Sequence, residues 1–534
     1  MPSAIPTPSG GVRAATPSGG VRAAIGGVSA AGVALGVGEL AAGLIGPESS
    51  PVLAVGAAAV DVSPRATTEF AISTFGSNDK LALLIGMLLV LAVAAALLGV
   101  LAVRRLGIGV AGMVVLGVVG AAAAVSRPGA SVLAAVPSLL AAAAGVGALL
   151  LMLRMLPAGR DDPADSGVPP ELPAPREIER RRFVLAAGAA AGVAVVTTGA
   201  GALVRRSRDV AQAREQLLVP AAATPGLGSD ALPAGFPDLA GLSPLLTPND
   251  DFYRIDTALR VPQIDPSNWS LRIHGRVERE LRFTFAELAG RDDLIEADIT
   301  LACVSNEVGG PLAGSARWVG VPLATLLAEA GVEPGADQVL TRSVDGWTCG
   351  TPTVDCQRTP NAMLALAMNG ENLPLEHGFP VRMIVPGLYG YVSATKWLVD
   401  MELTTFAGSD AYWVRRGWDA TAPIQTFSRI DVPRPGRTLG AGMAAIAGVA
   451  HSGSDGVSAV EVRIDDQPWE QARMSATTST QLWRQWYHPW VAELGLHVIS
   501  VRAVDGKGRT QSSSRYPPYP NASSGWHSVR VVVG

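Results

Sequence analysis

ADITLACVSNEVGG, residues 297–310, joins a run of apolar residues to a cysteine and a pair of glycines. The apolar run predicts a buried strand, and Gly309 and Gly310 predict a loop that lets backbone approach a ligand closely. The strand would therefore deliver Cys303 to the start of that loop. Such a thiol is either an inert packing residue or a ligand, and this stretch alone leaves both interpretations open.

Three further segments carry polar residues in a pattern typical of a cofactor site. They are TPNDDFYRIDTALRVP (247–262), LTRSVDGWTCG (340–350) and HGFPVRMIVPGLYGYVSATKWL (377–398). A phosphate-bearing ligand needs cationic or imidazole donors, and His377, Arg382 and Lys396 supply them. Each of the three is also compatible with an ordinary surface or turn residue when taken alone. The sequence contains no Walker-type or Rossmann glycine motif that competes for this role.

With GSARWVGVPL (314–323) added, the sequence over residues 244–534 resembles the sulfite-oxidase superfamily of molybdopterin enzymes, especially its bacterial membrane-tethered branch. The resemblance implies an α+β molybdopterin-binding domain over 244–430. It also implies that Cys303 is the single protein ligand of molybdenum and a catalytic residue, with Arg254 as a further catalytic anion contact. The cofactor-binding residues that it implies are Asn249, Tyr253, Arg254, Cys303, Ser343, Asp345, His377, Arg382, Ser393, Ala394, Thr395 and Lys396.

One departure from the family pattern bears on the substrate. Sulfite-oxidising members carry arginines shortly after the metal-binding cysteine, whereas this sequence has Asn306, Glu307 and Val308 there. Sulfite is therefore doubtful, and a neutral or differently charged small substrate, or a reductive direction, stays open.

The N-terminal half consists largely of Ala, Gly, Val and Leu. Five runs are long enough to cross a bilayer as helices, namely 24–46, 81–103, 106–126, 129–153 and 183–204. The first is richer in glycine and contains Glu39, so a signal sequence is the alternative interpretation. We expect a disordered tail over 1–22, which contains most of a tandem TPSGGVRAA repeat. The other expected segments are four transmembrane helices over 23–156, a cytoplasmic loop over 157–182, a fifth transmembrane helix over 183–204 and a linker over 205–243.

Arginines predict the orientation of these helices. If every run crosses, those before the first span and in the loops after the second and fourth spans fall on one side, which is then cytoplasmic. Arg180 and Arg181 before Phe183 form a pattern similar to a twin-arginine export signal, with ordinary positive-inside arginines as the alternative. Both observations predict a multi-pass protein of the cell membrane with an extracytoplasmic catalytic domain.

The last hundred residues alternate between apolar and polar positions. The stretches 460–464, 496–504 and 528–533 predict short strands separated by turn clusters. We interpret 431–534 as an immunoglobulin-like β-sandwich, which in the relatives forms a dimer interface, so a homodimer is possible.

The cysteines, the histidines and the net charge limit which disulfide, cofactor and partners we expect. Cys349 and Cys356 either form a disulfide, or Cys349 lines the site and Cys356 is buried. All six histidines follow residue 273 and no CxxCH occurs, so no haem is expected in this chain, and electrons require a separate cytochrome or quinone-linked partner. The net charge of −4 without a basic stripe argues against nucleic acid. A non-catalytic surface binding or adhesion protein with the same fold is the alternative function.

Overall fold

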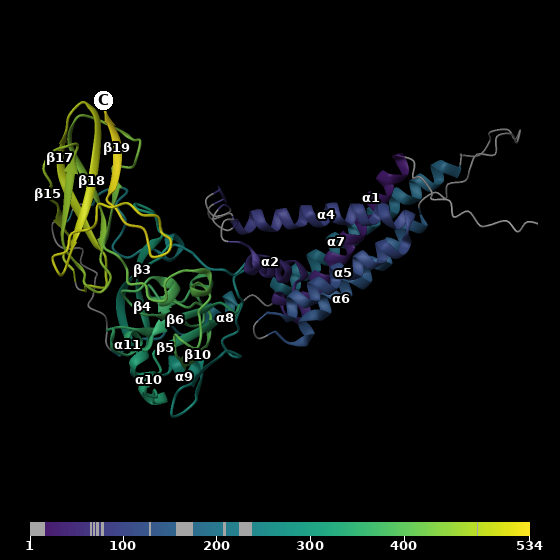
Figure 1. Ribbon diagram of the computed structural model, residues 1–534, viewed down its shortest axis with the longest axis horizontal. Coiled ribbons are helices and arrows are strands. Elements are labelled where there is room, and N and C mark those ends of the chain that lie inside the picture. The colour runs from purple at the N-terminus through teal and green to yellow at the C-terminus, as the bar shows by residue number, and fades with distance from the viewer. Residues whose placement is uncertain are drawn as a thin grey trace, which may run out of the picture. The chain divides into compact units, whose positions relative to one another are not determined.

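The computed structural model describes residues 17–64, 67, 70, 74–75, 79–127, 130–155, 175–206, 210–223, 236, 238–477 and 479–534. The chain divides into two units, Met1–Asp209 and Val210–Gly534. Figure 1 shows helices throughout the first unit and all the strands in the second.

The first unit is built from apolar helices. They are α1 (Pro17–Ile45), α2 (Pro51–Val62), α4 (Asp79–Arg104), α5 (Leu106–Val125), α6 (Val136–Arg154) and α7 (Pro175–Arg206), with short 3-10 helices η1 (Pro47–Ser49) and η3 (Val132–Ala135). Five segments are long and apolar enough to cross a membrane: Gly19–Ile45, Lys80–Arg104, Leu106–Val125, Val132–Arg154 and Arg181–Val204. The five expected apolar helices are therefore present, and their composition is that of membrane-associated helices.

Helix α1 packs against α4, α6 and α7. Its contact with α4 depends on glycine, because a Cβ atom on Gly27 would lie 2.0 Å from the Ala95 carbonyl oxygen. Small residues allow this close approach of two helix backbones. Glu39 in the same helix accepts a hydrogen bond from the Ser50 hydroxyl.

Three of the expected segment boundaries differ from the structure. Helix α1 begins at Pro17, inside the stretch expected to be a disordered tail, because proline is well tolerated in a first helical turn. Helix α7 begins at Pro175, inside the expected cytoplasmic loop. The expected linker contains helix α8 (Ala211–Gln216), where buried Val210 and the Arg214 side chain attach it to the second unit. Residues 1–16 and 156–174 of these segments lie outside the described residues.

The first part of the second unit contains two β-sheets and several short helices. One sheet has the order β2-β1-β10-β5-β6, with β1 and β10 parallel, and the other has the order β3-β4-β7-β8, with β9 paired to β7. The strands are β1 (Ser270–Gly275), β2 (Leu281–Thr284), β3 (Ile295–Ala302), β4 (Ala313–Pro322), β5 (Gln338–Ser343), β6 (Thr348–Pro352), β7 (Met363–Met368), β8 (Glu371–Asn372), β9 (Arg382–Ile384) and β10 (Leu398–Thr404). The helices are α9 (Phe285–Ala289), α10 (Leu323–Ala330) and α11 (Thr353–Arg358), with 3-10 turns η4 (Asn249–Asp251), η5 (Leu375–His377), η6 (Gly390–Val392) and η7 (Val414–Arg416).

The C-terminal part consists of two sheets around a common apolar core. Their orders are β11-β13-β17-β16 and β12-β19-β18-β14-β15. The strands are β11 (Phe427–Val432), β12 (Thr438–Leu439), β13 (Gly442–His451), β14 (Val457–Ile464), β15 (Glu470–Gln471), β16 (Arg473–Met474), β17 (Arg484–Ala492), β18 (Gly495–Asp505) and β19 (His527–Val533). The three strands expected from alternation are confirmed as parts of β14, β18 and β19.

Strand β11 crosses the expected boundary at residue 431. It pairs with β13 from Phe427 onward, so the C-terminal sheets begin before that boundary. A separate cluster of buried residues, which includes Ala302, Tyr389 and Trp483, joins the two parts of the second unit. The loop after β3 lies at this junction.

Candidate functional site

Strand β3 ends at Ala302, so Cys303 is the first residue of a closed loop that returns to β4. The Cys303 N–H donates to the Leu312 carbonyl (2.9 Å), and the Ser305 N–H donates to the Cys303 Sγ (3.4 Å). The side chain is partly buried. Burial raises the pKa of the Cys303 thiol, and a bound metal ion would be needed to hold the sulfur as a thiolate at neutral pH.

The C-terminal part of the second unit holds this loop through Arg429 of β11 and through Ser523 in the loop before β19. Ser523 Oγ donates to the Asn306 carbonyl (2.6 Å), and Arg429 Nη1 donates to the Gly310 carbonyl (3.0 Å). Gly309 has a φ of 81°, and a Cβ atom there would lie 2.3 Å from the His527 ring. Glycine is thus required both by conformation and by the close approach of the two parts.

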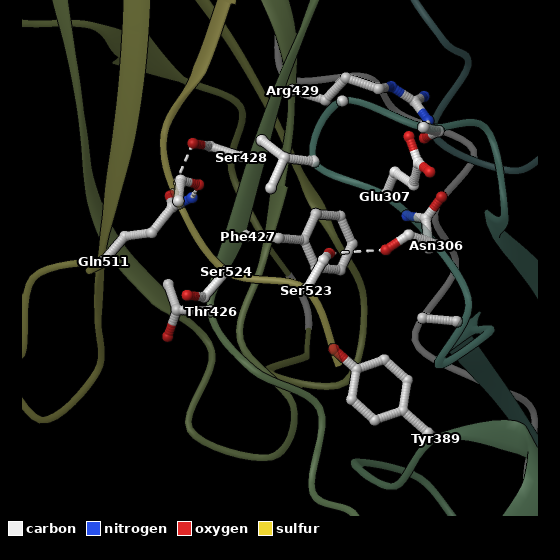
Figure 2. A pocket seen from close by; sticks show the side chains of 15 residues that line it. Asn306, Glu307, Tyr389, Thr426, Phe427, Ser428, Arg429, Gln511, Ser523 and Ser524 are labelled. Atoms are coloured by element: carbon white, nitrogen blue, oxygen red, sulfur yellow. Dashed lines mark hydrogen bonds between the residues drawn. The ribbon is translucent and has the colours of Figure 1, made fainter. Parts of the chain in front are cut away.

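A small cavity lies beside the loop, as Figure 2 shows. Its volume of about 20 Å³ is enough for a water-sized molecule. Asn306 and Glu307 line it from the Cys303 loop, Tyr389 from the loop before η6, and Thr426, Ser428 and Gln511 from the C-terminal part. The lining mixes polar groups with apolar ones such as Val308 and Phe427, and the Ser428 hydroxyl donates to Gln511 Oε1 (2.7 Å).

Arg382 is a buried cation with few partners. Its side chain on β9 is only 5% exposed, and its guanidinium lies 5.1 Å from the Trp318 ring centroid. Nη1 donates to the His377 carbonyl (3.1 Å), but Nε has no acceptor among the described residues. Desolvation lowers the pKa of Arg382 to about 10. A buried guanidinium with an unused donor suits an anionic ligand.

His377 lies directly beside this cation. Its Nε2 is 3.1 Å from the Asn249 carbonyl oxygen, and its ring meets Phe252 edge to face. Burial, followed by the positive charge of Arg382, lowers the pKa of His377 to about 4. The imidazole is therefore neutral at physiological pH, with one donor and one acceptor nitrogen.

Asn249 and Tyr253 come from the first segment. The Asn249 amide donates to Glu371 Oε1 (2.5 Å) and accepts from Asn369 (2.9 Å), so its side chain anchors the segment to the turn between β7 and β8. Tyr253 stacks on Phe252 at 5.3 Å. Burial raises the pKa of Tyr253, the nearby Cys303 raises it further, and Arg382 opposes both effects. The phenol is therefore within electrostatic reach of both the thiol and the guanidinium.

Lys396 and Arg254 share one carboxylate. Lys396 Nζ and Arg254 Nε each lie 2.8 Å from Asp256 Oδ2, and the Asp256 side chain is 4% exposed. Lys396 also donates to the Glu376 carbonyl (3.1 Å). Desolvation lowers the pKa of Lys396 to about 8, although Asp256 opposes the shift. The sequence interpretation missed Asp256, whose only signal was its position two residues after Arg254.

The remaining candidates lie in two neighbouring loops. Ser343 ends β5, and Asp345 Oδ1 accepts the Trp347 N–H (3.2 Å). Burial raises the pKa of Asp345, Asp256 also raises it and Lys396 lowers it, so this carboxyl faces the same cations.

In the loop before β10, hydroxyls and backbone groups mainly bond to one another. Ser393 Oγ donates to the Leu388 and Tyr389 carbonyls, both at 3.0 Å. The Ala394 N–H donates to Gly390 (2.9 Å), and Thr395 Oγ1 lies 2.6 Å from Thr341 Oγ1. These three residues therefore fix the backbone that presents Lys396.

Cys349 and Cys356 are free thiols, so the disulfide alternative is wrong for this structure. Both are fully buried in the core under the first sheet. Burial raises the pKa of Cys349 to about 11, and neighbouring threonine hydroxyls oppose the shift. Neither thiol is placed as a nucleophile or metal ligand.

Together these residues fit a metal carried by a phosphate-bearing organic cofactor. Within the described ranges, no cluster of three or more His, Cys, Asp or Glu side chains could hold a metal ion. A metal at Cys303 would thus take its other ligands from outside the chain. The unused Arg382 donor and the cations around Asp256 would suit the anionic part of the cofactor.

Comparison with known proteins gives one family match. The family described as "Oxidoreductase molybdopterin binding domain" matches residues 258–413. This range includes Cys303, His377, Arg382 and Lys396, whereas the segment with Asn249, Tyr253, Arg254 and Asp256 precedes it.

Several relatives are similar over longer stretches. Sulfite oxidase of Gallus gallus is 29% identical over 333 residues, which cover 53% of this chain and 72% of the relative. Mitochondrial sulfite oxidase of Rattus norvegicus is 27% identical, over 54% of this chain and 62% of the relative. The uncharacterized oxidoreductase YuiH of Bacillus subtilis is 31% identical over 158 residues, or 29% of this chain and 74% of the relative. Among solved structures, the sulfane dehydrogenase SoxCD of Paracoccus pantotrophus has a TM-score of 0.48 and 23% identity, over 56% of this chain and 87% of that chain.

Proposed function

This chain belongs to the sulfite-oxidase superfamily of molybdopterin-binding oxidoreductases, and on that premise we propose that it transfers an oxygen atom, with two electrons, to or from a small substrate at Cys303. The enzyme class and the molybdenum-molybdopterin cofactor follow from the family. The single observation that carries the proposal is the position of Cys303, which directly follows β3 and begins a loop closed by the hydrogen bond from its N–H to the Leu312 carbonyl.

The residues of this chain would hold and orient the cofactor. Cys303 would supply the one protein sulfur to molybdenum, while Arg382, His377 and Lys396 would bind the pterin and its phosphate. When bound, the cofactor supplies a metal that exchanges two electrons and an oxygen atom. Tyr253 would contribute to the same site, because its phenol interacts electrostatically with both Cys303 and Arg382. The C-terminal part would hold the shape of the Cys303 loop.

We propose a substrate that is not an inorganic anion. Asn306 and Glu307 line the cavity beside the Cys303 loop, in the stretch where sulfite-oxidising relatives carry arginines. Arg429 also lines the cavity, but its guanidinium already donates to the Gly310 carbonyl and pairs with Asp431. A carboxylate at the position of Glu307 repels an anionic substrate and attracts a neutral or cationic one. A small sulfur-containing or other neutral oxygen-atom donor or acceptor fits this charge pattern better than sulfite does.

The location and partners form a further proposal. We propose that the apolar helices anchor the chain in the cell membrane and that Arg180 and Arg181 direct export of the folded domain. A folded domain that contains a cofactor requires an export route for folded proteins, which supports this proposal. Electrons would pass to or from a separate cytochrome or quinone-linked protein. The C-terminal sheets would form an immunoglobulin-like sandwich and could pair two copies.

Metal content tests the enzyme proposal. The full chain, purified in detergent from a molybdopterin-competent host, should contain about one molybdenum per chain by mass spectrometry. Cys303→Ser should lose dye-linked turnover and most of the metal, and should keep part of the pterin, measured by fluorescence after oxidation.

Cys356→Ala is the matched control, because it removes a thiol that lies in the core. It should keep both metal and turnover. Wild-type protein without molybdenum would refute the proposal and favour a non-catalytic binding role, and unchanged turnover of Cys303→Ser would remove Cys303 from the mechanism.

A further inference from the structure

Asp256 is a buried carboxylate at the centre of a site that is otherwise cationic. One of its oxygens, Oδ2, lies 2.8 Å from both Lys396 Nζ and Arg254 Nε. The Asp256 side chain is 4% exposed and that of Lys396 is 10% exposed. A carboxylate oxygen that accepts from an ammonium and a guanidinium occupies the kind of position that a phosphate oxygen takes between two cations.

Several cations lie around Asp256 and the neighbouring His377. Arg254, Lys396 and Arg382 all lie close enough to lower the pKa of His377, which is itself neutral. Asp345 is a second acid here, and burial together with the charge of Asp256 raises its pKa. Asp256 is the carboxylate that pairs directly with two of these cations.

We propose that Asp256 is a positioning residue that acts as an internal counter-anion of the phosphate site. It holds Arg254 and Lys396 in place before a phosphate monoester binds, and it lies beside that phosphate afterwards. The inference rests on the proposed function in one respect, because the phosphate is taken to be that of the molybdopterin cofactor.

This role predicts two effects of opposite sign when the charge of Asp256 is removed. Without a ligand, the buried Lys396 ammonium and the more exposed Arg254 guanidinium lose their shared partner, and the loss of the partner of a buried charge destabilises a fold. With a phosphate bound, the same change removes a repulsion between like charges, so binding becomes tighter. A residue with only a structural role would weaken both stability and binding.

The test compares wild type with Asp256→Asn as full-length chains in detergent, produced in a host that makes no molybdopterin. The probe is inorganic phosphate, with binding measured by calorimetry and stability by thermal unfolding. Asp256→Asn should unfold at a lower temperature than wild type without phosphate, and it should bind phosphate about tenfold more tightly. Asp400→Asn is the matched control, since Asp400 pairs with His274 at 3.0 Å, and its phosphate affinity should equal that of wild type.

A second pair of variants keeps the test informative if Asp256→Asn alone does not fold. Lys396→Met removes one of the cations that would be left unpaired, and adding Asp256→Asn to it should again tighten phosphate binding about tenfold. Equal or weaker phosphate binding on removal of Asp256 would overturn the proposal, as would no phosphate binding by any of the proteins. The molybdenum content of wild type from a competent host tests the proposed function separately. A failure of the proposed function can therefore be told apart from a failure of the proposal for Asp256.

Discussion

Acid should destabilise the second unit through a buried histidine, His451, which lies outside the candidate site. His451 ends β13, is 1% exposed, and neither ring nitrogen has a hydrogen-bond partner among the described residues. Burial lowers the pKa of His451 from 6.5 to about 4. Because the pKa of His451 is lower in the folded than in the unfolded state, protonation favours the unfolded state. The stability that the neutral imidazole allows is fully present above pH 6.5 and is lost as the pH falls toward 4.

The magnitude follows from the two pKa values. Lowering the pH from 7.5 to 5 should reduce the free energy of unfolding by about 2 kcal/mol through this one residue. His377 and His527, whose pKa values burial also lowers to about 4, add to the loss in wild type. His451→Phe should therefore lose about 2 kcal/mol less than wild type between these pH values.

Urea unfolding followed by tryptophan fluorescence measures this difference in the full-length chain. All eleven tryptophans lie between residues 269 and 526, so the signal reports only the second unit. Comparing two pH values within each variant cancels any general effect of the substitution on stability. His451→Leu provides a second replacement.

His497 supplies a control of opposite sign. Its hydrogen bond to Asp465 raises its pKa, so His497→Phe should not reduce the acid-induced loss. If His451→Phe and His451→Leu lose as much stability as wild type between pH 7.5 and 5, the reasoning about the unpaired imidazole is refuted.

Three further predictions concern the site and export. Arg382→Met should lower pterin content at least tenfold while leaving the cofactor-free protein equally or more stable, because the buried guanidinium has no acidic partner among the described residues; a loss of stability with normal pterin content would contradict this. Ser523→Ala should remove the hydrogen bond to the Asn306 carbonyl, cost about 1 kcal/mol and speed hydrogen exchange in the loop after β3, and unchanged exchange would argue against a clamp. Arg180→Lys combined with Arg181→Lys should leave the catalytic domain protected from external protease in intact cells, whereas normal accessibility would count against twin-arginine export.

Long, continuous patterns were predictable from the sequence. The apolar helices of the first unit need only length and the absence of charge, and β14, β18 and β19 follow from alternation of apolar and polar residues. The strand before Cys303 was predictable for the same reason. Its eight residues, Ile295–Ala302, are mostly buried, and apolar residues occupy every second position between Glu296, Asp298 and Thr300.

Contacts between distant segments were not predictable. Asp256 pairs with Lys396 across 140 residues, and Ser523 reaches Asn306 across 217. Neither pair has a local signature, because the topology rather than the spacing brings the partners together. The state of Cys349 and Cys356 could not be decided from the sequence for a related reason, since both free thiols lie in an apolar core where packing alone accounts for them.

The anchoring of the Cys303 loop by the C-terminal sheets has an evolutionary consequence. Arg429, which holds the Gly310 carbonyl, lies on β11, whose sheet packs around a different core from that of β3, and Ser523, which holds the Asn306 carbonyl, lies in the loop before β19. Mutations in that second core can retune the surroundings of the thiol while the thiol itself is untouched. New substrate ranges can thus arise in this lineage through drift in a module that performs no chemistry of its own.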